Sequence, residues 1–257
     1  MTMKLLCWNV NGIRSAATKG FLPWLAKARP LALCIQEARA RPEQVDPELV
    51  TPRGYRSWWA CADKKGYSGV VIYSRVEPLD VTAGLGIPRF DCEGRLLAAR
   101  FADFTLVNAY FPNGQRDHAR VPYKMEFCEA FTAFCEARRS RGEHLVLCGD
   151  FNTAHREIDL ARPRENQNTT GFLPLERAWM DRFTDLGYQD IFRELNPASG
   201  HYTWWSNRSG ARERNIGWRI DYHFISPALR AKVKRVYHLP QVPGSDHCPL
   251  GLELQSP

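Results

Sequence analysis

The feature that most constrains this chain is a series of short apolar runs that recurs along all 257 residues. Runs of four to eight residues, rich in β-branched and aromatic side chains and bounded by turn-forming residues, are typical of β-strands. They predict strands at Lys4–Asn9, Leu31–Gln36, Gly69–Ser74, Leu96–Phe101, Thr105–Tyr110, His144–Cys148, His201–Trp205, Arg219–Ser226 and Leu250–Leu254. A chain with so many strands must bury them in packed sheets, which excludes a purely helical fold.

Helical patterns lie between some of these runs. The clearest covers Tyr123–Arg138, where three phenylalanines recur at i, i+4 and i+7 on one helix face. The next clearest are Phe21–Ala28 and Leu175–Leu186. Many strands with fewer helices between them predict an α/β sandwich, in which helices lie outside two packed sheets.

The composition is that of an ordinary globular protein, with 44% hydrophobic and 25% charged residues. The sequence shows no internal repeat, low-complexity tract or linker, so we expect one domain over residues 1–257, with Ala161–Gly171 as an ordered surface loop. The 35 basic residues exceed the 28 acidic ones by seven. This net charge of +7 favours a polyanionic partner, with nucleic acid first and an anionic membrane second.

Membrane and secretory features are not evident in the sequence. No apolar run approaches the roughly 18 residues that span a bilayer, and the first residues do not resemble a secretory signal. We therefore expect a cytoplasmic protein with no membrane partner. The eight cysteines form no C-x-x-C pair and several lie in apolar runs, which indicates buried free thiols and argues against a zinc site.

Six of the strand-like segments run into polar residues, in the sequences LLCWN-VN, LALCIQE, TLVNAY, LVLCGDFN, RID and GSDH. Asn9 and Asn11, and likewise Asp150 and Asn152, are two residues apart, so in an extended chain each pair points to one face. Such side chains can converge on one rim, where a cleft forms. Turn formation is the more usual explanation of any single ending, but six together favour a functional site.

These endings offer ligands for a hard cation. Glu37, Asp246, Asn9 and Asn11 present carboxylate and amide oxygens without a cluster of His or Cys. Glu37 is the strongest candidate, because an unpaired carboxylate at the end of a buried strand carries a large desolvation penalty. The sequence therefore predicts Mg²⁺, with Mn²⁺ as a substitute, and leaves open whether one ion or two are bound.

Eight segments occur in one order between Met3 and Leu254: WNVNGIR, QEAR, KKGYSGV, DCEGR, AYFPNG, CGDFNTAHREIDL, NIGWRIDY and GSDHCP. Together they resemble the motifs of the exonuclease III family of apurinic/apyrimidinic endonucleases. The N, QE, GDFN and SDH elements are shared by a wider endonuclease/exonuclease/phosphatase superfamily, which includes inositol polyphosphate phosphatases and sphingomyelinases. The GYSG, EIDL and NIGWRIDY segments are narrower and resemble the abasic-site branch.

The resemblance implies a four-layer α/β sandwich of two packed mixed β-sheets flanked by helices. It also implies Mg²⁺-dependent hydrolysis of the phosphodiester bond 5′ to an abasic site, which leaves a 3′-hydroxyl. A 3′–5′ exonuclease or 3′-end repair activity often accompanies it. The implied partner is double-stranded DNA with abasic sites or 3′ ends, and we expect a monomer located with the chromosomal DNA.

The resemblance also implies roles for individual residues. Asp150 would orient or deprotonate the attacking water, while Asn152 and Tyr110 would hydrogen-bond the phosphate. His247, held by Asp221, would face the phosphate as an imidazolium.

Further candidates fall into sets by role. The cation ligands are Asn9, Asn11, Glu37, Asp150, Asn152, Asp246 and His247. The DNA contacts are Tyr67, Asn113, Arg116, Asn166 and Arg208, of which the two arginines lie at loop tips that resemble duplex-inserting positions. The wall of the abasic-sugar pocket is Trp204, Trp218 and Ile220. His155 is expected to support the site indirectly, and Trp205 to lie in the core.

Two departures from the family pattern bear on these roles. Glu37-Ala38-Arg39 stands where the family usually has E-T-K, which keeps the ligand and a positive charge but alters a neighbour of the metal site. Trp204-Trp205 stands where relatives commonly have one Trp and another aromatic, which leaves the pocket size open.

Two other functions compete with the nuclease. One is a phosphatase or sphingomyelinase of the same superfamily, which the NIGWRIDY segment argues against. The other is a catalytically inactive DNA-binding module. The joint presence of the proposed catalytic and metal residues argues against that, because loss of even one is the usual mark of an inactive copy.

Overall fold

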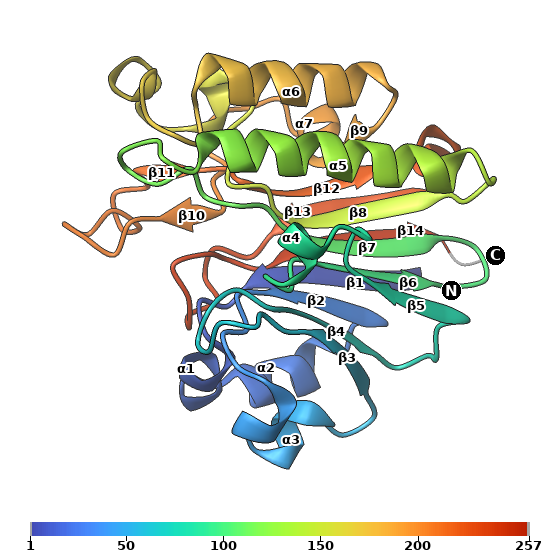
Figure 1. Ribbon diagram of the computed structural model, residues 1–257. Helices are drawn as coiled ribbons and strands as arrows, with labels where there is room; N and C mark the ends of the chain where they lie inside the picture. Colours follow the sequence, from blue (N-terminus) through green and yellow to red (C-terminus); the bar gives the residue numbers. More distant parts are fainter. Residues whose placement is uncertain (1, 256–257) are drawn as a thin grey trace.

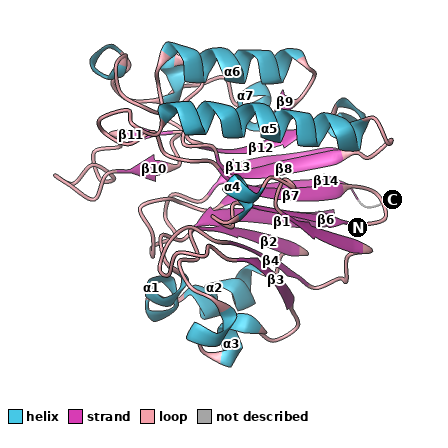
Figure 2. Ribbon diagram, in the orientation of Figure 1, coloured by secondary structure: helices cyan, strands magenta, loops and turns pink. Residues whose placement is uncertain are grey.

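Two six-stranded sheets pack face to face in the computed structural model, which describes residues 2–255 (Figures 1 and 2). The first sheet contains, in spatial order, β13 (Val233–His238), β14 (Leu250–Gln255), β1 (Thr2–Asn9), β2 (Ala32–Gln36), β4 (Val70–Ser74) and β3 (Arg56–Ala60). The second contains β5 (Asp80–Ala83), β6 (Leu96–Arg100), β7 (Thr105–Tyr110), β8 (Leu145–Asp150), β12 (Asp221–Ile225) and β9 (Gln189–Asp190). Both sheets are mixed, since β1 pairs with β2 and β7 with β8 in parallel.

Helices cover the outer face of each sheet, so the predicted four-layer sandwich is confirmed (Figure 1). The helices on the first sheet are α1 (Ile13–Thr18), α2 (Phe21–Ala28) and α3 (Pro47–Val50). Those on the second are α4 (Pro88–Asp91), α5 (Val121–Arg139) and α6 (Pro174–Asp185). The short helix α7 (Ile191–Leu195) packs beside β12 and β13. Within residues 2–255, no helix combines the length and apolarity that crossing a bilayer requires.

Alternation along each strand divides the interior into three layers. In β1, Leu5 and Cys7 face the second sheet, while Leu6 and Trp8 pack against α1 and α2. Each of the eight cysteines is free, as expected, and six are buried, whereas Cys61 is half-buried and Cys92 is exposed.

A buried polar contact ties the two sheets together. Asn108 of β7 donates from its Nδ2 to the carbonyls of Ile35 and Val71 in the first sheet, at 3.0 and 2.9 Å. Its Oδ1 accepts from Gln36 Nε2 at 2.6 Å. Because a buried amide is costly unless its hydrogen bonds are made, these contacts favour one relative position of the sheets.

One predicted strand, His201–Trp205, is largely wrong. Only β10 (Trp204–Trp205) is a strand, and it pairs with β11 (Gly217–Trp218) as a two-stranded ribbon. Thr203 donates its N–H to the Trp218 carbonyl and accepts at its own carbonyl from Cys248 N. It therefore joins two separate segments instead of extending one ladder.

The fold predicts an acid-sensitive stability that depends on His223. This residue lies within β12, has no exposed surface, and its two ring nitrogens have no hydrogen-bond partner among the described residues. Burial lowers the pKa of His223 from 6.5 to about 3. Below pH 6.5, His223 binds a proton in the unfolded chain but stays neutral in the folded chain. The free energy of unfolding therefore falls as the pH falls, by roughly 2 kcal/mol at pH 5.

Thermal unfolding at pH 7 and pH 5 checks this expectation. His223→Leu should narrow the difference in Tm between the two pH values, because the variant has no ring to protonate. His144 is exposed, so His144→Gln serves as the control and should keep the wild-type difference in Tm. An unchanged difference in His223→Leu would assign the acid sensitivity to other groups.

Candidate active site

A cavity of about 800 Å³ opens where strand ends of both sheets meet. The predicted site residues that line it are Asn11, Glu37, Tyr110, Asn113, Arg116, Asp150, Asn152, Asn166, Trp204, Arg208, Trp218, Ile220, Asp246 and His247. Asn9 and Asp221 lie directly behind this lining, in contact with Asp150 and His247 respectively. The polar residues at the strand ends therefore converge on one cavity.

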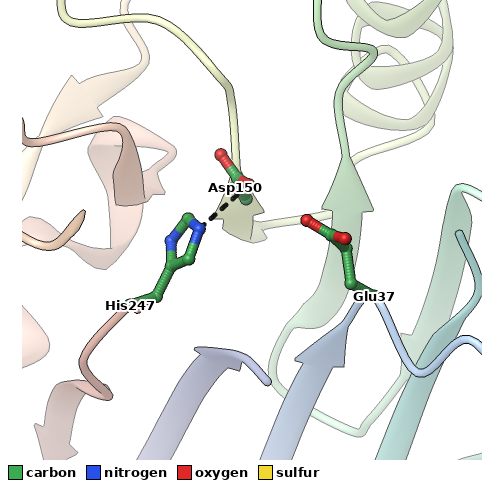
Figure 3. Close-up of side chains that lie close together, drawn as sticks. All are labelled: Glu37, Asp150 and His247. Carbon is green, nitrogen blue, oxygen red and sulfur yellow. Dashed lines mark ion pairs between the residues drawn. The ribbon is translucent and has the colours of Figure 1, made fainter. Parts of the chain in front are cut away.

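An acidic cluster lies at the base of the cavity. Glu37, Asp150 and His247 each offer a ligand atom, and these atoms lie within 4.8 Å of one another (Figure 3). Glu37 follows β2, Asp150 ends β8, and His247 precedes β14, so both sheets contribute. Gly149 permits the close approach of β8 to β7, because a Cβ there would lie 1.8 Å from the Ala109 carbonyl oxygen.

Asn9 joins the carboxylates across the two sheets. Its Nδ2 donates to Glu37 Oε1 at 2.9 Å and to Asp150 Oδ2 at 2.8 Å. Its Oδ1 accepts from the backbone N–H of Asn11 at 3.0 Å. Asn9 is fully buried and uses both donors on carboxylates, so it holds the two acidic groups at a fixed separation.

His247 is held by a buried carboxylate. Its Nδ1 lies 2.8 Å from Asp221 Oδ2, which also accepts from Thr203 Oγ1 at 2.6 Å. Its Nε2 faces Asp150 Oδ2 at 3.9 Å. Burial opposes the charged form, but Asp221, Asp150 and Asp246 outweigh it and raise the pKa of His247 to about 10. The ring is therefore an imidazolium at neutral pH, with Nε2 directed toward Asp150.

The other carboxylates respond differently to their surroundings. Burial, with the neighbouring charges of Asp221 and Glu37, raises the pKa of Asp150 to about 7. For Asp246, burial is outweighed by His247 and by hydrogen bonds from Asn11 and Trp204, which lower its pKa. A carboxylate with a pKa near 7 can accept a proton at neutral pH, which is the property of a general base.

The donor set fits a divalent cation. Four carboxylates, Glu37, Asp150, Asp221 and Asp246, face two cationic side chains, His247 and Arg39. Asp221 Oδ1 is buried and has no hydrogen-bond partner among the described residues. Arg39 donates from Nε to Glu37 Oε2 at 2.8 Å, so arginine in place of the family's lysine keeps a positive charge beside this carboxylate. The excess of negative charge and the oxygen-rich donors suit a hard cation.

Asn152 has a strained backbone that a buried ion pair supports. Its φ of 49° is left-handed, and its carbonyl accepts from Lys124 Nζ at 2.7 Å. Lys124 is paired with Glu176 at 2.6 Å, and Glu176 in turn accepts from the Gly171 N–H at 2.6 Å. Gly171 lies against the Trp218 ring, since a Cβ there would lie 3.3 Å from it. The Lys124–Glu176 pair therefore holds Asn152 through its carbonyl and, through Gly171, the loop that contacts Trp218.

Two tryptophans form one wall of the cavity. Trp204 and Trp218 are half-buried and meet edge to face, with ring centroids 6.4 Å apart. Trp204 Nε1 donates to Asp246 Oδ2 at 3.1 Å, which links the wall to the acidic cluster. Ile220 packs with both rings. Trp205 is buried on the opposite side of its strand, as expected.

The predicted DNA contacts lie around the mouth of the cavity, with one exception. Arg116 and Arg208 are exposed there, Asn166 is half-buried, and Asn113 donates to Asn152 Oδ1 at 3.1 Å. Tyr67 lies outside the lining, and its hydroxyl accepts from two arginines. His155 also lies outside the lining and contacts Asp181 Oδ1 at 2.7 Å.

Three supporting residues were not predicted from the sequence: Thr203, Lys124 and Arg95. Thr203 and Lys124 carry no local signal, because each acts on a segment that is distant along the chain. Arg95 stands in the DCEGR segment, which gave a signal of resemblance without a role. Arg95 Nη1 donates to the Tyr110 carbonyl at 3.0 Å.

Comparisons with known proteins agree with this geometry. The model of the endonuclease/exonuclease/phosphatase family matches residues 6–247. An exodeoxyribonuclease of Bacillus subtilis (strain 168) is 41% identical over 252 residues, which cover 97% of this chain and 98% of the relative. The DNA repair nuclease APEX1 of Danio rerio is 40% identical over 255 residues, covering 98% and 82%. The solved structure of an AP endonuclease from Archaeoglobus fulgidus superposes with a TM-score of 0.90 at 30% identity, covering 99% and 100%.

The hydrogen bond between Asp221 and His247 should raise the pKa of the imidazole. In Asp221→Asn the largest stabilising charge is lost, so the pKa of His247 should fall by more than one unit from its value of about 10. Titration of the His247 ring by NMR, in chelator, measures this change. Thr203→Ser keeps the hydroxyl that contacts Asp221 and should leave the pKa in place. A His247 pKa that stays near 10 in Asp221→Asn would assign the shift to the other carboxylates.

Proposed function

The chain belongs to the endonuclease/exonuclease/phosphatase family, and we propose that it hydrolyses the phosphodiester bond 5′ to an abasic site in double-stranded DNA. It is a DNA repair nuclease, and its relatives at 40–41% identity are a DNA repair nuclease and an exodeoxyribonuclease. The proposal includes a 3′-hydroxyl product and some 3′–5′ exonuclease or 3′-end repair activity, which the exodeoxyribonuclease name of the Bacillus relative supports. A single observation carries it: one cavity joins the acidic cluster, the tryptophan wall and an arginine-bearing mouth.

The proposal assigns Mg²⁺ to the acidic cluster, with Mn²⁺ as a substitute. The ligands would come from Glu37, Asp246 and Asn11, with Asn9, Asp150 and Asn152 beside them. When bound, the cation stabilises negative charge on the phosphoryl oxygens and makes a bound water more acidic. A protonated His247 cannot be a ligand, because coordination requires the neutral imidazole. His247 would become a ligand only after losing its proton, and its raised pKa favours the phosphate contact in this proposal.

The protein's own groups divide the chemical work. Asp150, whose pKa is raised to about 7, orients the attacking water and accepts its proton. His247 presents Nε2–H to the phosphoryl oxygens, and Asp221 holds the ring from the other side. Tyr110 and Asn152 line the same cavity and donate hydrogen bonds to the phosphate. Burial and the charge of Glu37 raise the pKa of Tyr110 well above its usual range, so it keeps its proton.

Substrate selection would come from the cavity wall and mouth. A deoxyribose without a base packs between Trp204, Trp218 and Ile220, whereas an intact nucleotide clashes there. Arg116 and Arg208 reach the duplex from the exposed mouth. The net charge of +7 favours DNA and predicts binding that weakens with salt. A monomer located in the cytoplasm with the chromosomal DNA completes the proposal.

A cleavage gel, run beside two substrate assays, separates the proposed function from its competitors. An end-labelled duplex with a single tetrahydrofuran abasic site should be cut 5′ to that site with Mg²⁺ or Mn²⁺, and should stay intact in EDTA. Parallel assays with inositol polyphosphates and sphingomyelin should release no product. Faster turnover of either small substrate would favour the phosphatase or sphingomyelinase. DNA binding without cleavage would favour an inactive module, and full cleavage in EDTA would exclude the cation mechanism.

The tryptophan wall should control the preference for abasic DNA. Trp218→Ala opens the wall, so the variant should cut undamaged duplex or 3′ ends relatively faster and narrow the rate ratio between abasic and undamaged DNA. Melting curves should show only a modest loss of stability, because Trp218 is half-buried. The core variant Trp205→Ala is the control for lost packing and should lower stability more. An unchanged ratio in Trp218→Ala would place the selective pocket elsewhere.

A further inference from the structure

We propose that Arg95 is a positioning residue for Tyr110, which it clamps through the backbone and through the face of the ring. The proposal deepens the proposed function and rests on it, because Tyr110 is there the hydrogen-bond donor to the phosphate. Arg95 lies outside the cavity lining and its side chain is 2% exposed, so a substrate in the cavity does not reach it. Its influence on the reaction passes through Tyr110.

The clamp has three points of contact. The Tyr110 N–H donates to the Arg95 carbonyl at 2.8 Å, and Arg95 Nη1 donates back to the Tyr110 carbonyl at 3.0 Å. The guanidinium carbon lies 4.7 Å from the centroid of the Tyr110 ring. Both backbone polar groups of Tyr110 are therefore bonded to one residue, whose side chain also covers the ring.

The remaining donors of Arg95 are fixed by a partly buried network. Nε donates to Glu93 Oε2 at 2.6 Å, and Nη2 donates to the Tyr67 hydroxyl at 2.9 Å. Arg120 donates to the same hydroxyl at 2.6 Å and to Glu93 Oε1 at 2.8 Å. A planar fork with donors in several directions satisfies all these partners, whereas a lysine ammonium cannot also cover the ring.

Charge and backbone geometry both favour this arrangement. The side chain of Arg95 is 2% exposed, so its charge needs a buried partner. Burial favours protonated Glu93, but Arg95 and Arg120 outweigh it and lower the pKa of Glu93, which keeps the pair ionised. Gly94 has a φ of +60°, and a Cβ there would lie 2.5 Å from the Cys61 carbonyl carbon. The turn before Arg95 therefore has no room for a side chain and requires glycine.

The expected consequence is a fixed direction for the Tyr110 hydroxyl. Tyr110 ends β7 beside Asp150, with which it is in register on β8. A ring that is held from behind loses less freedom when its hydroxyl donates to the phosphate. Loss of the clamp should therefore slow the chemical step while leaving DNA binding nearly unchanged.

A double-mutant cycle tests the proposal by single-turnover incision of a tetrahydrofuran duplex. Arg95→Lys should lower the rate by about 10-fold or more, and should have at most about a threefold effect when Tyr110 is already replaced by Phe. Arg138→Lys is the matched control, because Arg138 also pairs with a carboxylate, Glu143, and covers a ring, Phe134, away from the cavity. It should not change the rate in either background. Equal losses from Arg95→Lys in both backgrounds, or no loss at all, would overturn the proposal.

A second measurement does not depend on the substrate. In protein labelled with ¹³Cζ-tyrosine, Arg95→Lys should shift the Tyr110 signal, identified by its absence in Tyr110→Phe, while Arg138→Lys should not. An unchanged Tyr110 signal would overturn the proposal, whether or not the protein cuts the duplex. Failure to cut the duplex would instead contradict the proposed function. Should Arg95→Lys not fold, Glu93→Gln takes its place in both experiments, with the same outcomes expected.

Discussion

The structure depends on one electrostatic constraint, the burial of several carboxylates where strand ends of the two sheets meet. Asp150 is 1% exposed and Asp221 is fully buried, so water screens neither charge. Asn9 links Asp150 to Glu37 by donating to both carboxylates, and His247 supplies a positive charge beside Asp221 and Asp150. Holding such a cluster requires close relative placement of the sheets, which the buried Asn108 contacts favour. A divalent cation would therefore interact most favourably with the protein at this cluster.

This constraint links binding to chemistry. Trp204, a wall of the cavity, donates to Asp246, and Asn152 rests on the Lys124–Glu176 pair that also fixes the loop behind Trp218. In the proposed complex, a sugar packed against the tryptophans would therefore lie beside groups that are already oriented for attack on its phosphate. Pre-organisation of this kind lowers the reorganisation needed during the reaction.

Much of the fold and site could be predicted because their signals are local. Strand periodicity located most of the central strands, and polar strand ends such as Glu37 and Asp150 marked the site. The four edge strands of the six-stranded sheets, β3, β5, β9 and β13, were missed. Exposed polar residues weaken the apolar pattern of β5 and β13, β9 has only two residues, and β3 has no buried residue. Sheet order and supports such as Thr203 and Arg95 depend on contacts between distant segments, for which a single sequence carries no local signal.

The central claim is that the buried acidic cluster is a cation site built around Glu37. The most direct test is thermal unfolding in chelator and in excess Mn²⁺, because an ion that binds only the folded chain raises Tm. The account predicts a clear rise in Tm for the wild-type protein and its loss in Glu37→Gln, whose folded state should remain intact in chelator. No rise in the wild-type protein, or the same rise in Glu37→Gln, would contradict it.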